Sequence, residues 1–95
     1  MRVLGTAVIT KACKDYPNCA DALRAWVKLM KSCSAKHASD LQKTFSYVDP
    51  VPPQTVFNIG GNDLRLIAKI NYQVQVVRIQ YVLTHAEYDK NNWKE

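Results

Sequence analysis

The chain lacks the long hydrophobic runs of membrane-spanning helices. No stretch approaches the roughly 18 apolar residues that such a helix needs, although 47% of the 95 residues are hydrophobic. The first residues also lack the apolar core of a secretory signal peptide, so we expect a cytoplasmic protein without a membrane partner. A chain of this length can build one modest hydrophobic core, and we expect a single domain over residues 1–95.

Cysteine and histidine are scarce. Cys13, Cys19 and Cys33 are odd in number and match neither a zinc-ligand nor a Cys-x-x-Cys spacing. We interpret them as small apolar side chains of helices in a reducing compartment. His37 has no partner at metal-ligand spacing. We therefore expect no metal site and no cofactor.

Acidic residues are few in the first half of the chain, which carries the net charge of +5. A basic surface favours polyanions such as RNA, because bound phosphates release counterions. The alternative is a solvated surface that only keeps the protein soluble.

The first half predicts mainly helices. Arg2-Val3-Leu4 fits a short strand. Thr6 is placed to cap a helix over Ala7–Tyr16, which Pro17 ends. Three further elements are expected before the sheet: a helix over about Cys19–Cys33 capped by Asn18, a short helix Asp40–Phe45 capped by Ser39, and a proline-containing loop Tyr47–Pro53.

The second of these helices has an apolar stripe at spacings of three and four residues. Lys28 and Lys31 lie between its members on the open side. The stripe consists of Ala22, Trp26, Leu29 and Cys33.

The second half predicts an antiparallel sheet. Two strands, within Val56–Ile70, fold about a Gly-Gly turn, and a third covers Val74–Val82. Period-two alternation gives the sheet one apolar face, which the two long helices are expected to cover. The fold class is therefore α+β, with two N-terminal helices on a mainly antiparallel sheet and a short C-terminal helix. The residues of the apolar face are Phe57, Ile59, Leu64, Leu66, Ala68, Ile70, Val77, Ile79, Tyr81 and Leu83.

Turn lengths predict the strand register. A two-residue turn at Gly61-Asn62 pairs Phe57 with Leu66, Ile59 with Leu64 and Asn58 with Arg65.

A second two-residue turn, at Tyr72-Gln73, pairs Asn71 with Val74 and puts Ile67 opposite Arg78. Arg78 would then lie diagonal to both Arg65 and Lys69, within reach of long side chains. These three cations on one face predict a phosphate site. The alternative is that they repel one another and extend into solvent.

A capping box follows the third strand. The Thr84 hydroxyl can accept from the amide of Glu87, whose carboxylate can reach back. His85 then takes the first helical position, where the helix dipole favours a neutral imidazole, while Glu87 and Asp89 favour the charged form. Tyr88 shares a helix face with His85. Taken alone, each of the two has an ordinary structural explanation.

Three segments, in this order and spacing, resemble the HigB family of toxins in the RelE/ParE superfamily of toxin–antitoxin systems. They are Val56-Phe57-Asn58-Ile59-Gly60-Gly61-Asn62, then Leu64-Arg65-Leu66-Ile67-Ala68-Lys69-Ile70-Asn71-Tyr72, and finally Thr84-His85-Ala86-Glu87-Tyr88-Asp89, with Arg78 before the last. The resemblance extends over almost the whole chain.

The resemblance implies a RelE-like fold and an mRNA interferase that cuts messages during translation. It also implies a HigA-type antitoxin with a helix-turn-helix. The basic sheet residues of the family fall on Arg65, Lys69 and Arg78, and its C-terminal pair falls on His85 and Tyr88.

The corresponding hypothesis for catalysis needs no metal. The 2′-hydroxyl of the message attacks the adjacent phosphate, with His85 as candidate proton acceptor and Tyr88 as donor or substrate aligner. Arg65, Arg78 and Lys69 would stabilise the charge on the phosphate. A further group of basic residues would contact ribosomal RNA: Lys11, Lys14, Lys28 and Lys31.

Three alternatives stay open at this point. A ParE-like gyrase poison would need no catalytic residues. A binding module would bind RNA or the ribosome and leave the RNA uncut. A toxin without activity would serve only its antitoxin.

Overall fold

The computed structural model describes residues 1–45, 47–61 and 63–94. Within them one sheet has the strand order β1-β5-β4-β3-β2, with β1 parallel to β5 and the other neighbours antiparallel. The elements are β1 (Arg2–Leu4), α1 (Thr6–Asp15), the 3₁₀ helix η1 (Pro17–Cys19), α2 (Ala20–Ser32), α3 (Ala38–Leu41), β2 (Val48–Val51), β3 (Gln54–Ile59), β4 (Leu64–Asn71), β5 (Val76–Thr84) and α4 (His85–Asp89). The predicted α+β class is confirmed.

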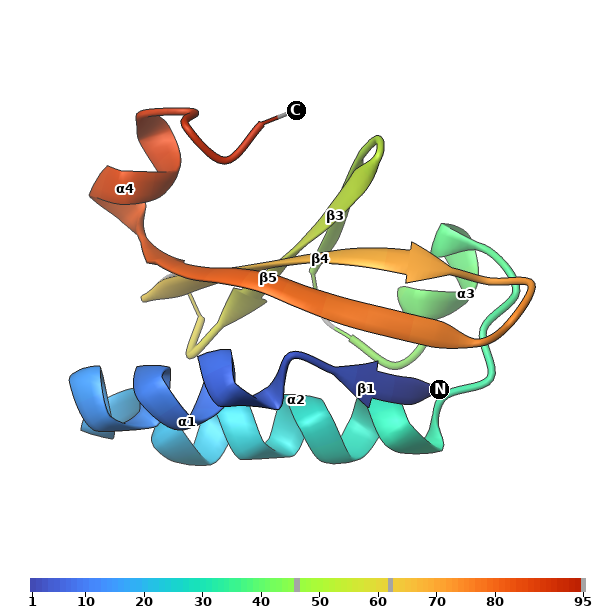
Figure 1. Cartoon of the computed structure of the whole chain (residues 1–95), viewed down its shortest axis with the longest axis horizontal. Helices are drawn as coiled ribbons and strands as arrows, with labels where there is room; N and C mark the ends of the chain where they lie inside the picture. Colours follow the sequence, from blue (N-terminus) through green and yellow to red (C-terminus); the bar gives the residue numbers. More distant parts are fainter. Residues whose placement is uncertain (46, 62, 95) are drawn as a thin grey trace.

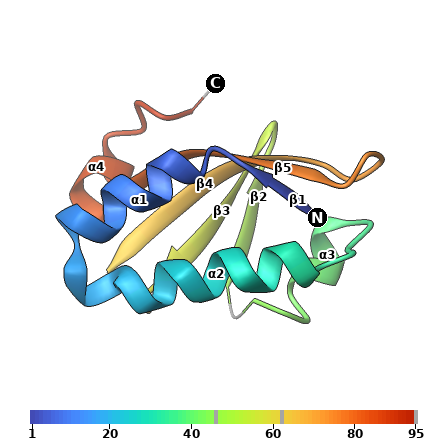
Figure 2. The same ribbon diagram turned by 60° about the horizontal axis from the view of Figure 1, so that its bottom comes forward.

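The two long helices pack on one side of the sheet, and α4 lies on the other (Figure 1). Figure 2 shows α1 and α2 side by side across the sheet. We call the side that they cover the helix face and the opposite side the second face. The helix face carries the main core, in which the sheet contributes Val48, Phe57, Ile59, Leu64, Leu66, Ala68, Val77 and Ile79.

The turn from β1 into α1 depends on Gly5, which has a φ of 84°. A Cβ at this position would lie 2.6 Å from the carbonyl oxygen of Ile79 in β5, so the close approach requires glycine. Thr6 is consequently the first residue of α1, and its predicted role as the cap is wrong. Gly61 also has a positive φ, of 71°, but open space surrounds it.

The second helix differs from the prediction in its start and its buried side. Pro17–Cys19 form the 3₁₀ helix, so α2 begins at Ala20 and Asn18 does not cap it. Leu29 is 44% exposed. The predicted stripe and the stripe that is buried in the structure share Trp26. The buried stripe has the larger side chains, which bury more apolar surface. The residues that this stripe buries are Leu23, Trp26 and Met30.

The predicted cap of the third helix is also wrong. His37 precedes α3, which ends at Leu41, and Ser39 lies inside it. The Asp40 carboxylate accepts hydrogen bonds from the backbone amides of Lys36 and His37 at 3.0 and 3.2 Å. The bond from Lys36 is the largest of the effects that lower the pKa of Asp40.

The segment predicted as a loop, Tyr47–Pro53, contains strand β2. It pairs with β3 along one side only, with Asp49 opposite Val56 and Pro50 opposite Thr55. An edge strand tolerates proline because its outer side needs no amide donor. The prolines are therefore compatible with an edge strand, and the prediction of a loop over the whole segment is wrong.

The first hairpin follows the predicted register. Phe57 pairs with Leu66 and Asn58 with Arg65. The amide of Asp63 donates to the carbonyl oxygen of Gly60 at 3.4 Å. The predicted turn residue Asn62 lies outside the described residues.

The second hairpin has a longer turn than predicted. Asn71 pairs with Val76 and Lys69 with Arg78, so the turn covers 72–75 and the predicted pairing of Ile67 with Arg78 is wrong. The Asn71 side chain accepts hydrogen bonds from the amides of Gln73 and Val74 at 3.1 and 3.3 Å. These bonds form an Asx turn, which stabilises the wider loop.

A register shift between Ile67 and Ala68 then exchanges the two sides of β5. Ala68 lies opposite Ile79, but Ile67 lies opposite Tyr81. Tyr81 and Leu83 are therefore on the second face, and their predicted place in the core is wrong. This face has its own small cluster, which consists of Val56, Ile67 and Trp93.

No helix of the described residues is long and apolar enough to cross a bilayer. The three cysteines are free; Cys19 is buried, and Cys13 and Cys33 are half-buried against the main core. Their interpretation as small apolar side chains agrees with this packing.

Candidate active site

The candidate site lies over three residues that are direct partners on neighbouring strands of the second face. Asn58 on β3 pairs with Arg65 on β4, which pairs with Leu83 on β5. Arg65 is only 8% exposed. Its Nη1 donates to the carbonyl oxygen of Leu64 at 3.3 Å. The guanidinium is thus held within the fold, on the second face of the sheet.

His85 contacts this arginine directly. Nη2 of Arg65 lies 2.6 Å from Nε2 of His85. A guanidinium can only donate, so Nε2 accepts and the ring proton is on Nδ1. The arginine therefore selects the tautomer of the exposed histidine and occupies the lone pair that would accept a proton.

The predicted capping box holds His85 in this position. The amide of Glu87 donates to the Thr84 hydroxyl at 3.3 Å, and the Glu87 carboxylate accepts from the Thr84 amide at 3.0 Å. The backbone bond to Thr84 is the main cause that lowers the pKa of Glu87. The box ends β5 and starts α4 in one step, so the first helical residue points back at Arg65.

Tyr88 packs over the same arginine, and Trp93 packs on Tyr88. The guanidinium carbon of Arg65 lies 5.5 Å from the centre of the Tyr88 ring. The Tyr88 ring stacks on Trp93 with centroids 5.0 Å apart and 14° between the planes. The indole N–H of Trp93 donates to the Tyr88 carbonyl at 2.9 Å. Buried Gln54 donates to the Trp93 carbonyl at 3.0 Å and anchors this segment on β3.

Tyr88 is in an environment that keeps its proton. Burial raises the pKa of Tyr88, and the nearby Asp49 carboxylate and the Tyr47 hydroxyl raise it further, while Arg65 lowers it in part. A neutral phenol can donate a proton but cannot accept one as a phenolate would. The site therefore combines a proton donor, an imidazole and an arginine.

Sequence reasoning missed three residues of this site: Tyr47, Asp49 and Trp93. Asp49 pairs with Val56 and so lies on the second face beside Tyr88. Asp49 lies in β2 and Tyr47 directly before it, so the prediction of a loop here gave neither residue a face. A tryptophan a few residues after a short amphipathic helix was the available signal for Trp93.

Lys69 and Arg78 lie apart from the Arg65–His85 pair. They are opposite each other on β4 and β5. Lys69 is four residues beyond Arg65 on the same strand, a distance of about 13 Å. Ile67 lies between them, in the cluster with Trp93. The structure thus gives two cationic positions on the second face in place of the single predicted cluster.

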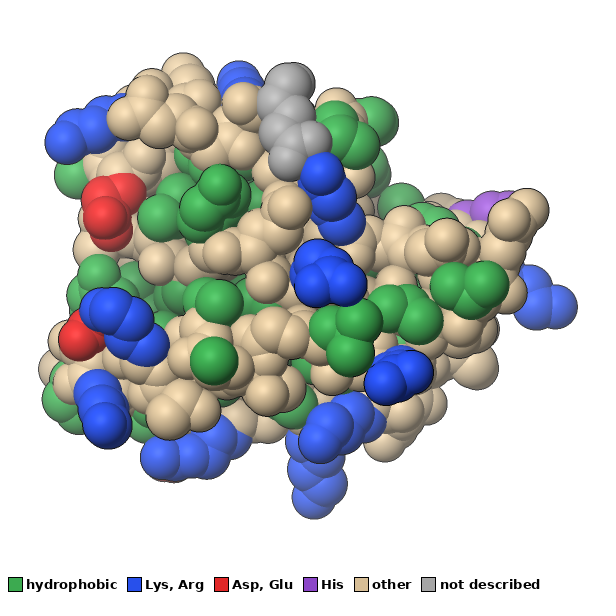
Figure 3. Space-filling model, in the orientation of Figure 1, with side chains coloured by type: hydrophobic (Ala, Val, Ile, Leu, Met, Phe, Trp, Pro, Cys, Tyr) green, Lys and Arg blue, Asp and Glu red, His purple; other side chains and the backbone are tan. Residues whose placement is uncertain are grey.

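The predicted ribosome-binding lysines lie on the two helices that cover the helix face, and one of them, Lys11, also borders a hollow with Leu83 and Glu87. Lys11 and Lys14 belong to α1, and Lys28 and Lys31 to α2, all exposed. Nζ of Lys11 lies 2.6 Å from the Asp15 carboxylate, which raises the pKa of Lys11. Basic side chains gather along α1 and α2 in Figure 3, and others lie over the sheet.

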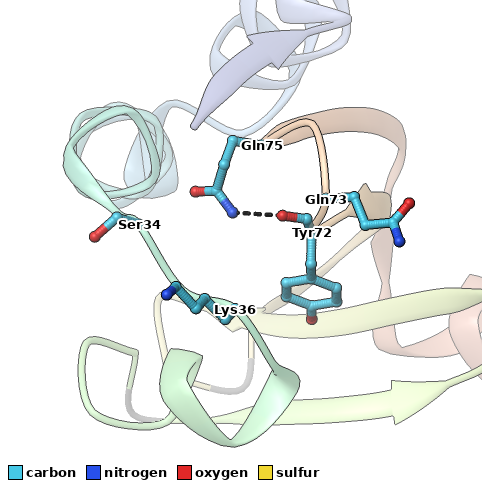
Figure 4. A pocket seen from close by; sticks show the side chains of 5 residues that line it. All are labelled: Ser34, Lys36, Tyr72, Gln73 and Gln75. Atoms are coloured by element: carbon cyan, nitrogen blue, oxygen red, sulfur yellow. Dashed lines mark hydrogen bonds between the residues drawn. The ribbon is translucent and has the colours of Figure 1, made fainter.

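A hollow of about 500 Å³ lies beside the β4–β5 turn, at the opposite end of β4 from Arg65 (Figure 4). Gln75 crosses its floor and donates to the carbonyls of Tyr72 and Ala35 at 2.8 and 2.9 Å. Its lining includes no histidine, arginine or carboxylate among the described residues. Nor do the described residues include three His, Cys, Asp or Glu side chains placed to hold a metal ion.

Comparison with known proteins finds one matching family and several similar chains. Residues 19–91 match the HigB toxin family, described as the RelE-like toxic component of a toxin-antitoxin system. The chain is 29% identical over 93 residues to an mRNA interferase HigB of Escherichia coli O6:H1, covering 95% of the chain and 90% of that protein. It is 29% identical over 92 residues to an mRNA interferase toxin HigB of Escherichia coli K12, covering 94% and 88%.

Proposed function

Because the chain belongs to the HigB family of RelE-like toxins of toxin–antitoxin systems, we propose that it is an mRNA interferase, an endoribonuclease that cuts messages on the translating ribosome. It then stops translation in the cytoplasm. A HigA-type antitoxin with a helix-turn-helix silences it. The relatives that carry the name mRNA interferase support the reaction class.

One observation carries this proposal: the 2.6 Å contact between Arg65 and His85 beside the Tyr88 ring. A buried arginine, an exposed imidazole and a protonated phenol are the groups that an internal transesterification of RNA requires. The reaction needs a proton acceptor for the 2′-hydroxyl, a proton donor for the leaving oxygen and positive charge for the phosphate.

The reaction forms one bond and breaks one. The 2′-oxygen attacks the adjacent phosphorus, and the bond from phosphorus to the 5′-oxygen breaks. The products are a 2′,3′-cyclic phosphate and a free 5′-hydroxyl. His85 takes the proton of the 2′-hydroxyl, and Tyr88 gives its proton to the 5′-oxygen. No metal or cofactor enters this scheme.

Arg65 couples substrate binding to base activation. In the free protein its guanidinium occupies Nε2 of His85. A phosphate offers the guanidinium two anionic oxygens, which it prefers to a neutral nitrogen. The phosphate therefore draws Arg65 away from His85, and the lone pair of Nε2 becomes available when the substrate is in place.

The second cationic position has a binding role. Lys69 and Arg78 are opposite each other, about 13 Å from Arg65 along the strand direction. We assign them to another phosphate of the same strand. The lysines Lys11, Lys14, Lys28 and Lys31 hold ribosomal RNA backbone, and rising salt weakens that contact steeply.

Induced expression followed by primer extension on a translated message tests the proposal. Wild type should arrest growth and produce new 5′ ends within the message. Arg65→Ala and His85→Ala should each abolish most of the cleavage, because each group contributes about 10²- to 10⁴-fold. The matched controls are Arg24→Ala and His37→Ala, which change exposed residues away from the site.

The outcomes separate function from site. Growth arrest without new 5′ ends, with inhibited gyrase supercoiling, would identify a ParE-like poison. Full cleavage by both Arg65→Ala and His85→Ala would show that the catalytic site lies elsewhere. Loss of cleavage in the control variants would show that the assay responds to general damage.

A further inference from the structure

The register shift in β5 exposes an aromatic ring beside the candidate site. Ile79 belongs to the main core, but two residues later Tyr81 is on the second face and 45% exposed. Without the shift, Tyr81 would continue the alternation and lie under α1. Bulges are frequent beside active sites, where they redirect a side chain. The shift thus exposes a ring that the simple strand pattern would bury.

Tyr81 forms one wall of a hollow between β5 and the C-terminal segment. The hollow has a volume of about 240 Å³. It is smaller than the roughly 300–1,000 Å³ of sites for drug-sized ligands, which suits a single flat ring. Its lining residues are Tyr81, Leu83, Glu87, Lys90, Asn92 and Trp93.

The hollow adjoins the Arg65–His85 pair. Leu83, in its wall, is the direct partner of Arg65 across β4 and β5. Directly opposed residues have Cβ atoms about 5 Å apart. A nucleotide whose phosphate contacts Arg65 therefore has the hollow within reach of its base.

The chemistry of the lining suits a nucleobase. Tyr81 and Leu83 offer an apolar surface on which a base can stack, whereas buried Trp93 has its ring against Tyr88. The amide of Asn92 can donate and accept at a base edge. Lys90 supplies a positive charge at the rim for the attached phosphate. Proteins bind single-stranded RNA mainly by such stacking on aromatic side chains.

We infer that this hollow is a nucleobase subsite of the candidate active site, in which a base flanking the scissile phosphate stacks on Tyr81. The inference rests on the proposed function, since it assumes that RNA is the substrate. It adds the position of one base and the side chain that holds it.

The test uses RNA that cannot be cut. Short single-stranded 2′-O-methyl oligonucleotides lack the attacking hydroxyl, and 2-aminopurine is placed at each position in turn. Binding of wild-type protein should quench the probe at one position of the strand. Tyr81→Ala should remove that quenching and weaken binding about 5- to 100-fold, the range for one stacked base. Tyr81→Phe keeps the ring and should retain both.

Val74→Ala is the matched control, because Val74 is an exposed hydrophobic residue at the far hairpin tip. It should bind and quench as wild type does. Equal quenching by wild type and Tyr81→Ala would overturn the inference, as would absence of quenching at every position. Quenching that depends on Tyr47, the other exposed tyrosine of the second face, would also overturn it.

This result is independent of cleavage. If wild type quenches through Tyr81 but yields no new 5′ ends in primer extension, the subsite stands and the proposed reaction fails. If cleavage occurs without Tyr81-dependent quenching, the reaction stands and the subsite fails. Thermal unfolding of Tyr81→Ala confirms that the variant is folded before either comparison.

Discussion

The helix face and the second face of the sheet differ in what covers them. Two long helices bury a continuous cluster on the helix face, whereas the buried cluster of the second face consists, among the described residues, of Val56, Ile67 and Trp93. The second face carries Arg65. Tyr88, which packs against the small cluster of this face, also packs against the guanidinium of Arg65. Stability therefore depends mainly on one face and the proposed chemistry on the other, with the C-terminal segment contributing to both.

The largest predicted effect is a loss of stability when the core of the helix face is changed. Phe57 is 1% exposed and contacts the rings of Trp26 and Phe45, with centroids 5.3 and 5.1 Å apart. Phe57→Ala should cost about 3–5 kcal/mol in the free energy of unfolding. Urea unfolding measures this cost. The folded fraction should keep its cleavage rate, and a loss of rate in fully folded protein would contradict the division between faces.

Trp93 should show the contribution of the C-terminal segment to both properties. Trp93→Ala removes the stack under Tyr88 and the hydrogen bond to its carbonyl. We expect kcat for cleavage to fall about 10- to 100-fold at temperatures where the variant is folded, because small displacements of catalytic groups are costly.

Trp93→Phe keeps an aromatic ring without the indole N–H and should recover most of kcat. Circular dichroism establishes the folded range for both variants. If Trp93→Ala loses stability but cleaves at the wild-type rate, Trp93 serves only packing and does not position Tyr88.

Arg78 should affect binding more than turnover. Because Arg78 lies apart from His85, Arg78→Ala should raise KM about tenfold with little change in kcat. It should also reduce the salt dependence of RNA binding by about one phosphate contact. Arg24→Ala on α2 is the matched control. A fall in kcat at unchanged KM would place Arg78 among the catalytic residues after all.

The smallest effect concerns the capping box. Thr84→Ala should cost about 0.5–2 kcal/mol in stability. The pKa of Glu87 is lowered in the folded protein by its bonds to Thr84, so the folded state binds the proton less tightly than the unfolded chain. This contribution is complete above the unfolded pKa and is lost as the pH falls through the lower folded pKa.

Thermal unfolding of wild type and Thr84→Ala between pH 3 and 7, values chosen to bracket the ordinary pKa of a carboxyl of about 4.3, measures this difference. Thr84→Ala keeps the backbone amide that is the main cause of the lowered pKa of Glu87 and loses only the bond from the Thr84 hydroxyl, so the two should converge only in part at acidic pH. Glu87 is exposed, so the convergence should be small. A gap that does not narrow at low pH would mean that the Thr84 hydroxyl acts without the Glu87 charge.

Local patterns were sufficient where one turn or one short motif decides the structure. The β3–β4 register followed from the Gly-Gly turn, and the capping box at Thr84 from four residues. The β4–β5 register did not, because the Asn71 side chain supports a longer turn and the shift beyond Ile67 responds to packing on both faces. The sequence pattern therefore placed Arg65 on one face of the sheet and His85 directly after the last strand, and put Tyr81 on the wrong face.

Tyr47, Asp49 and Trp93 were not predicted as site residues for a common reason. Asp49 lies on an edge strand that contains proline, and Tyr47 directly precedes that strand. Trp93 joins the site through hydrogen bonds with Gln54, 39 residues away, and Tyr88, five residues away. Sequence spacing carries no information about such long-range contacts until strand order is known. For the same reason, the sequence predicted one cluster of Arg65, Lys69 and Arg78, where the structure has two separate cationic positions.

Gly5 and Gly61, two of the three glycines with positive φ, differ in their tolerance of mutation. At position 5 any side chain would meet the backbone of β5 at 2.6 Å, while position 61 faces open space and asparagine readily adopts its backbone conformation. Bacteria that survive expression of this toxin without its antitoxin should therefore often carry changes of codon 5, and Gly61→Asn should be rare among them. The pattern of escape mutations would thus report which tight turn the toxin needs in order to fold.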